Sequence, residues 1–73
     1  MLLSELKDGQ SGVISSLNFD ADFARRLAEM GFCKGKRVKR ICACAFGSPI
    51  LFEAMDGWIA LRKYDAQRIE VVV

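Results

Sequence analysis

The chemistry that this chain could carry starts with its cysteines. It has three, and two of them, Cys42 and Cys44, are separated by one residue. On an extended strand both thiols would point to the same side, so they could hold one metal ion together. A closed zinc site needs a full tetrahedral set of ligands, and the sequence has no histidine and no Cys-x-x-Cys pair. We therefore expect no cofactor.

Small thiols buried inside the core are the favoured interpretation of Cys42 and Cys44, because unpaired cysteine is among the most buried residue types. A metal ion bound through both thiols is the lesser alternative. It would require a second copy of the chain to supply the remaining ligands.

The other residue types that drive catalysis are missing or badly placed. The sequence has no histidine, no carboxylates at a spacing that would pair them, and no glycine-rich loop ahead of a helix. A phosphate site would need free N–H groups at a helix start, whereas Gly31 and Gly35 follow the predicted helix. Both glycines are interpreted as turn residues, and we expect a protein that is not an enzyme.

Positive charge is concentrated in one stretch. Five of the eleven basic residues lie at positions 34–40, close in sequence to Arg25 and Arg26, although the formal net charge is only +2. Such a surface would suit an acidic partner protein or the phosphates of nucleic acid. Nucleic acid favours aromatic side chains among the basic ones, and Phe32 is the only aromatic residue nearby. A solvated strand edge, whose lysines discourage association between edges, is the plain alternative.

These residues give a set of candidates for contact with a partner. The electrostatic candidates are Arg25, Arg26, Lys34, Lys36 and Arg37. Met30 and Phe32 are candidate apolar anchors on the condition that they are not fully buried. Core packing is the favoured role for both.

One helix is predicted, from Asp22 to Met30. Phe23, Leu27 and Met30 recur at helical spacing. Asp20 or Asp22 could accept hydrogen bonds from the free N–H groups at the helix start. Gly31 falls where a helix commonly ends on a left-handed residue, so the chain is expected to turn there into the basic stretch.

The rest of the chain is predicted as short strands. They cover residues 10–17, 36–45, 50–55, 58–62 and 68–73, with a bulge near Arg40 and one helical turn over 63–67. Alternating apolar residues give the strands from Ile50 to Ala54 and from Ile69 to Val73 one buried face each. Asp56-Gly57 predicts a tight hairpin turn. The residues assigned to turns are Gly31, Gly35, Gly47, Pro49, Asp56 and Gly57.

Size and composition fit one small domain. With 73 residues, 52% of them hydrophobic, the chain has room for a single domain over residues 1–73. Leu3 and Leu6 are expected to close one end of its core. No secretory signal or membrane span is apparent, so the expected location is the cytoplasm. The strands are predicted to curl into a small β-barrel, which leaves few free edges.

Four motifs follow one another along the chain. They are Leu3-Ser4-Glu5-Leu6-Lys7-Asp8-Gly9, Arg26-Leu27-Ala28-Glu29-Met30-Gly31-Phe32-Cys33-Lys34-Gly35, Gly47-Ser48-Pro49-Ile50 and Ile59-Ala60-Leu61-Arg62. This ordered set resembles the FeoA family of bacterial ferrous-iron transport proteins. The Cys42-Ala43-Cys44 stretch is no part of the family's pattern.

The resemblance implies an SH3-like barrel with about five strands and one short helix inserted after the first strand. It also implies an accessory protein of ferrous iron uptake that binds FeoB, the membrane transporter with a GTP-binding domain, and modulates it. The protein would reach the membrane through that partner. The alternative function is a basic SH3-like module that binds nucleic acid, although we expect no such partner. A weak homo-oligomer is left open.

Overall fold

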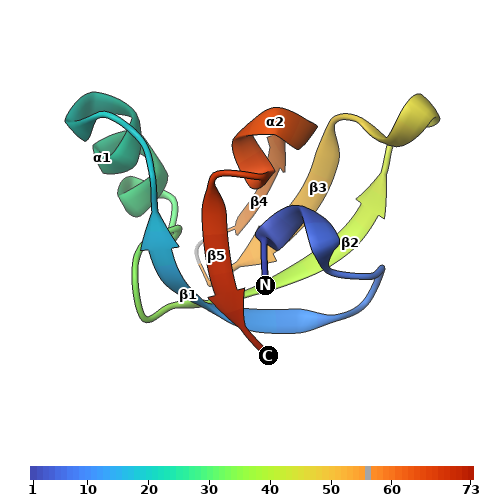
Figure 1. The fold of residues 1–73 in the computed structure, drawn as a ribbon, viewed down its shortest axis with the longest axis horizontal. Helices are drawn as coiled ribbons and strands as arrows, with labels where there is room; N and C mark the ends of the chain where they lie inside the picture. Colours follow the sequence, from blue (N-terminus) through green and yellow to red (C-terminus); the bar gives the residue numbers. More distant parts are fainter. Residues whose placement is uncertain (56) are drawn as a thin grey trace.

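The computed structural model describes residues 1–55 and 57–73, which form one antiparallel sheet of five strands in the order β4-β3-β2-β1-β5 (Figure 1). The strands are β1 (Ser11–Leu17), β2 (Arg37–Ala43), β3 (Ile50–Ala54), β4 (Gly57–Leu61) and β5 (Ile69–Val72). The helical segments are η1 (Leu3–Glu5), α1 (Ala21–Glu29), η2 (Ala45–Gly47) and α2 (Lys63–Ala66). The predicted fold class, mainly β with a short helix after the first strand, is confirmed.

Two irregularities bend the sheet around its core. The register of β1 against β5 shifts between Ile14 and Ser16. The register of β2 against β3 shifts between Arg40 and Cys42, which confirms the predicted bulge near Arg40. An extra residue on one strand increases the local twist. As a result the sheet curves strongly, and Figure 1 shows β5 in front with β4, at the other end of the strand order, fainter behind it.

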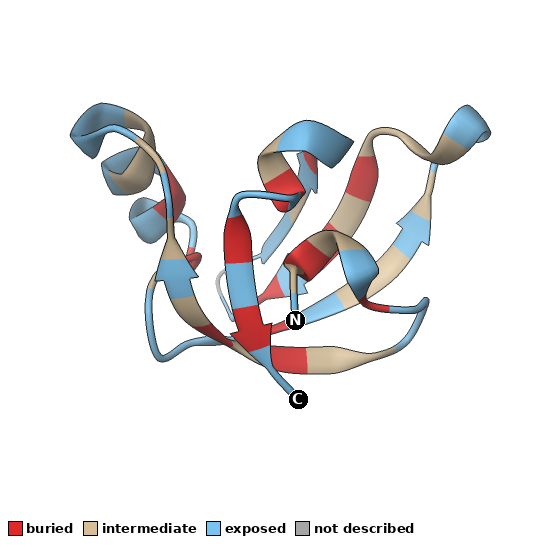
Figure 2. Ribbon diagram, in the orientation of Figure 1, coloured by how far each residue is buried: buried red, intermediate tan, exposed pale blue. Residues whose placement is uncertain are grey.

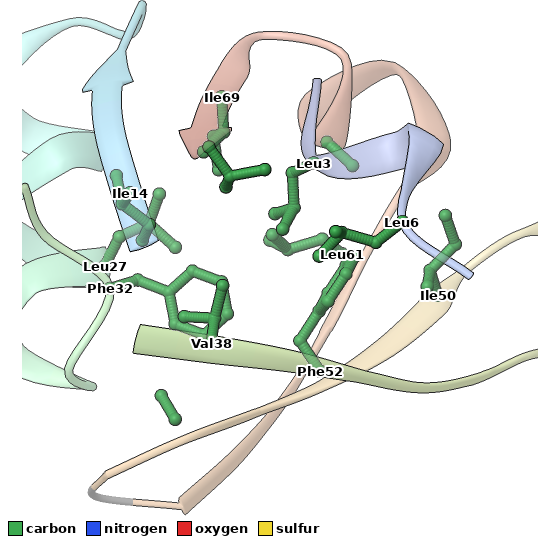
Figure 3. Packing of buried hydrophobic residues seen from close by; sticks show 13 residues of the cluster. Leu3, Leu6, Ile14, Leu27, Phe32, Val38, Ile50, Phe52, Leu61 and Ile69 are labelled. Atoms are coloured by element: carbon green, nitrogen blue, oxygen red, sulfur yellow. The ribbon is translucent and has the colours of Figure 1, made fainter. Parts of the chain in front are cut away.

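The concave side of the sheet holds one hydrophobic cluster, seen in red in Figure 2 and as sticks in Figure 3. Leu3, the first residue of η1, and Leu6, the residue after it, are 0% and 1% exposed, so the N-terminal segment closes the core as predicted. The largest fully buried side chains come from η1, α1, four of the five strands and the segments after η1 and α1: Phe32, Phe52, Leu3, Leu6, Ile14, Leu27, Ile50, Ile69, Val38 and Val71.

Two details of the strands differ from the prediction. Val73 lies beyond the end of β5 and is 70% exposed, so the buried alternation of the last strand stops at Val71. Gly57 pairs with Ala54 and begins β4, so it belongs to the strand and not to the predicted turn. The prediction for Asp56 falls on a residue outside the described part of the chain. On β3, Ile50, Phe52 and Ala54 are all buried, as expected.

The prediction that Cys42 and Cys44 are buried is wrong, because both are exposed. The bulge after Arg40 is the physical reason. One extra residue reverses the alternation of β2, so Ala43 packs against the core while the cysteines face outward. Cys33, in the loop after α1, is half-buried.

Candidate protein-interaction surface

The surface around the basic residues is set by how α1 begins and ends. Asp20 caps the helix: its Oδ1 accepts a hydrogen bond from the Phe23 N–H at 2.9 Å. At the other end, the Phe32 N–H donates to the Leu27 carbonyl at 2.8 Å and the Gly31 N–H donates to the Ala28 carbonyl at 3.0 Å. This pair of hydrogen bonds is the Schellman motif that ends many helices. The prediction that Gly31 stops the helix is confirmed.

The helix end decides the role of Phe32. Gly31 has a φ of +88°, which turns the chain back so that Phe32 enters the core beside Leu27 (Figure 3). Phe32 is 0% exposed, and its ring lies 6.1 Å from that of Phe52 in an edge-on arrangement. Core packing, the favoured role, is therefore confirmed for Phe32, which does not meet the condition set for an apolar anchor. Met30, the last residue before the turn, is 42% exposed and does meet it.

Hydrogen bonds to β1 hold the loop after α1 in place. The Gly35 N–H donates to the Ile14 carbonyl at 2.8 Å, and the Ile14 N–H donates to the Lys36 carbonyl at 2.9 Å. Gly35 has a φ of +88° and nothing within 4 Å of where a Cβ would stand, so backbone conformation alone favours glycine there. Lys34 and Lys36 are thus presented to solvent on a fixed backbone.

The predicted basic contacts fall into two groups. Lys36 and Arg37 line a depression of about 440 Å³ at the start of β2. Arg26 lines a different depression, at the start of α1, together with Asp20 and Asp22. Arg25 is exposed and forms a 3.7 Å ion pair with Asp22. The positive charge of α1 is therefore partly offset by its own acidic residues.

The depression beside β2 is the better candidate for binding a partner. It is open to solvent. Three cationic side chains, one carboxylate and several apolar side chains line it. Its lining residues are Ser11, Lys36, Arg37, Val38, Lys39, Glu53, Ala54 and Met55. We call it the β2 groove. Lys39 and Met55 were absent from the predicted contacts, because only the pairing of β2 with β3 brings Lys39 next to Glu53 and the start of the hairpin.

Arg40, by contrast, does not belong to this surface. Its Nε donates to Oδ1 of Asp8 at 2.8 Å, and its Nη1 donates to the Leu6 carbonyl at 3.0 Å. The side chain is only 19% exposed. The last basic residue of the stretch therefore ties η1 to β2 and is not available to a partner.

A metal ion at the cysteines would need further ligands close to them. Within residues 1–55 and 57–73, no group of three or more histidine, cysteine, aspartate and glutamate side chains is gathered closely enough to hold a metal ion. In the same described residues, no helix is both long and apolar enough to cross a membrane.

Comparison with known proteins identifies the relatives of this fold. A family model described as the FeoA domain matches residues 1–73. A protein assigned as Fe(2+) transport protein A in Campylobacter jejuni is 38% identical over 71 residues, covering 97% of this chain and 96% of that protein.

Two further matches extend the comparison. The Fe(2+) transport protein A/Fe(2+) transporter FeoB fusion protein of Porphyromonas gingivalis is 37% identical over 71 residues, which are 97% of this chain and 8% of that protein. The crystal structure of a Stenotrophomonas maltophilia protein complexed with zinc, described as a prokaryotic SH3 domain protein, superimposes with a TM-score of 0.78. It is 37% identical and covers 97% of this chain and 88% of that one.

Proposed function

The chain belongs to the FeoA family of ferrous-iron transport proteins, and on that premise we propose that it is a cytoplasmic accessory protein that binds FeoB and modulates it. The observation that carries the proposal is the fusion in Porphyromonas gingivalis, where a relative of this chain shares one polypeptide with an FeoB transporter. Domains joined in one chain stay at high effective concentration. A family member that is not fused to FeoB would reach the same contact by binding.

The surface that supports this role is the β2 groove, together with the exposed Lys34 just before it in the sequence. Lys36, Arg37 and Lys39 surround the groove, and Met55 is 83% exposed at its rim. A mixed basic and apolar groove fits an acidic segment that also carries an apolar side chain. Charges at the rim of such a contact mainly raise the association rate and fix orientation. The protein acts without catalysis of its own, by changing how FeoB hydrolyses GTP.

Binding is tested with the cytoplasmic part of FeoB and a set of charge-reversal variants. Lys36→Glu/Arg37→Glu should weaken the complex at least tenfold, because it reverses two charges that line the groove. Arg25→Glu/Lys34→Glu should weaken it less, since Arg25 is already paired with Asp22. Arg62→Glu/Lys63→Glu, at the start of α2, changes the net charge equally and should bind like the unaltered protein.

Two results would contradict the proposal. If the groove variant binds FeoB as tightly as the unaltered protein, this surface is not the contact. If saturating amounts of the protein leave the rate of GTP hydrolysis by FeoB unchanged, modulation is excluded. Raising the ionic strength should lower the association rate, and an association rate independent of salt would exclude electrostatic docking.

A further inference from the structure

The two edges of the sheet are treated differently. At the β5 edge, the N-terminal amine of Met1 donates to the Val71 carbonyl at 3.0 Å, and the Val71 N–H donates to the Met1 carbonyl at 2.8 Å. Leu2 adds a bridge to Glu70. At the other edge, β4 pairs with β3, and no other described residue pairs with its outer side. One edge is covered by the chain itself and the other is open.

The hydrogen bonds of β2 determine, through β3, which residues of β4 direct their backbone N–H and C=O groups away from the sheet. The Arg40 N–H donates to the Gln10 carbonyl at 3.0 Å, and the Gly9 N–H donates to the Arg40 carbonyl at 2.6 Å. Arg40 therefore directs its backbone groups toward the β1 side. Successive residues of a strand direct their backbone N–H and C=O groups to opposite sides. The backbone groups of Lys39 must then point toward β3, where Lys39 pairs with Glu53.

The same alternation carries through to β4. Because Glu53 is bonded to β2, its neighbour Phe52 directs its backbone groups toward β4, where it pairs with Ile59. Ile59 is thus bonded to β3, and the residues beside it, Trp58 and Ala60, point their N–H and C=O groups away from the sheet. Both residues are exposed.

We propose that this edge binds the same edge of a second copy, with the two β4 strands antiparallel about a two-fold axis at Ile59. In that register Trp58 lies opposite Ala60 of the second copy, and the reverse pair is identical by symmetry. Each of these pairs has outward groups on both residues. Each can therefore exchange both of its backbone hydrogen bonds, which is the closely spaced antiparallel pair.

The composition of β4 favours a second copy as the occupant. Its sequence, Gly57-Trp58-Ile59-Ala60-Leu61, has no charged residue and no proline, the features that usually protect an edge strand. No like charges within β4 meet across the axis. The pairing also sets the large Trp58 opposite the small Ala60 on one face of the sheet. Since Met1 and Leu2 cover the β5 edge, association ends at two copies and does not continue into a fibre.

The test removes one outward donor and leaves the fold of the single chain intact. Ala60→Pro deletes an N–H that points away from β3, and proline is tolerated on an edge strand in that setting. Ala60→Ser changes the same side chain and keeps the N–H, so it is the matched control. Sedimentation from micromolar to millimolar concentration should show the unaltered protein and the serine variant rising from 8.1 kDa toward twice that mass. The proline variant should dissociate at least tenfold more readily.

A second measurement needs no variant and covers the case in which Ala60→Pro does not fold. Amide hydrogen exchange of Trp58 and Ala60 should be fast in dilute protein and become slow at high concentration, while that of Ile59 stays slow throughout. A protein that remains a monomer at millimolar concentration would overturn the proposal. So would a dimer in which the Trp58 and Ala60 amides still exchange freely, or a folded proline variant that dimerises as the unaltered protein does. None of these measurements involves FeoB.

Discussion

Arg40 and Asp8 form an ion pair with 2.8 Å between Nε and Oδ1, and the same guanidinium donates to the Leu6 carbonyl. Arg40→Met should lower the free energy of unfolding by about 1–3 kcal/mol, because it leaves the carbonyl without its charged partner. Asp8→Asn should cost less than about 1 kcal/mol, since Asp8 is 62% exposed and water screens its charge. Urea unfolding of both variants measures the two losses in the free energy of unfolding. Arg37→Met, at an exposed position of the same strand, is the control, and an equal loss there would exclude a special role for Arg40.

The start of α1 gives a prediction that separates two aspartates. Asp20→Ala should destabilise the protein by about 1 kcal/mol, because the Phe23 N–H loses its acceptor. Asp22→Ala removes only an exposed ion pair to Arg25 and should cost less than about 0.5 kcal/mol. Thermal or urea unfolding distinguishes the two. Equal effects would mean that charge near the helix start matters more than the cap.

The end of α1 gives a prediction about backbone conformation. Gly31→Ala should cost about 1–2 kcal/mol, because alanine must adopt a φ near +88°. Gly31→Asn should cost less, since asparagine tolerates the left-handed region better than other residues with a side chain. Denaturant unfolding gives the order. An asparagine variant that is less stable than the alanine variant would show that space around the buried Gly31, and not backbone strain, is limiting.

The turn before β3 offers a stabilising substitution. Phe46 has a φ of +65° and its side chain is fully exposed, so it carries backbone strain without contributing to the core. Phe46→Asn should raise the free energy of unfolding by about 0.5–1 kcal/mol by relieving part of that strain. Phe46→Leu keeps an apolar side chain with the same conformational penalty and should leave stability nearly unchanged. A loss of stability in the asparagine variant would indicate that the aromatic ring makes a contact of its own.

The outward cysteines give a prediction in chemical reactivity. In the folded protein, an alkylating reagent should modify Cys42 and Cys44 rapidly and Cys33 more slowly, because accessible thiols react first. Mass spectrometry over time would show two fast additions and one slow one. In denaturant the three rates should converge. If Cys42 in the folded protein reacts as slowly as Cys33, its side chain does not face outward after the bulge in β2.

What the sequence predicts well depends on local chemistry. The helical stripe, the stop at Gly31 and the turn of α2 lie within a few residues of the features that encode them. The surroundings of Arg40 do not, because Asp8 and the Leu6 carbonyl are more than thirty positions away in the sequence, and from sequence alone Arg40 looks like one more surface cation. Cys42 was misplaced for a related reason. The bulge was expected, but its effect on which side chains face the core depends on where the extra residue lies.

In the candidate site too, features encoded by local sequence could be predicted, and features that depend on strand pairing could not. Exposure of Lys34, Lys36 and Arg37 could be expected from charge alone, and the structure presents all three. The β2 groove could not, because it exists only where β2 and β3 pair and bring Lys39 beside Glu53. Phe32 failed as a surface anchor because a buried apolar residue is the partner that this type of helix end favours.

β1 pairs with β2 on one side and with β5 on the other, and this arrangement has a consequence for the order of folding. β2, β3 and β4 are neighbours in the chain and join through short connections, so they can form a meander from local contacts. β1 must pair with β5, which is the last strand, and that step closes a loop of most of the chain. We expect the meander to form early and the β1–β5 ladder to close last. During synthesis, the sheet and the buried cluster beneath it would therefore stay incomplete until residues 69–72 are available.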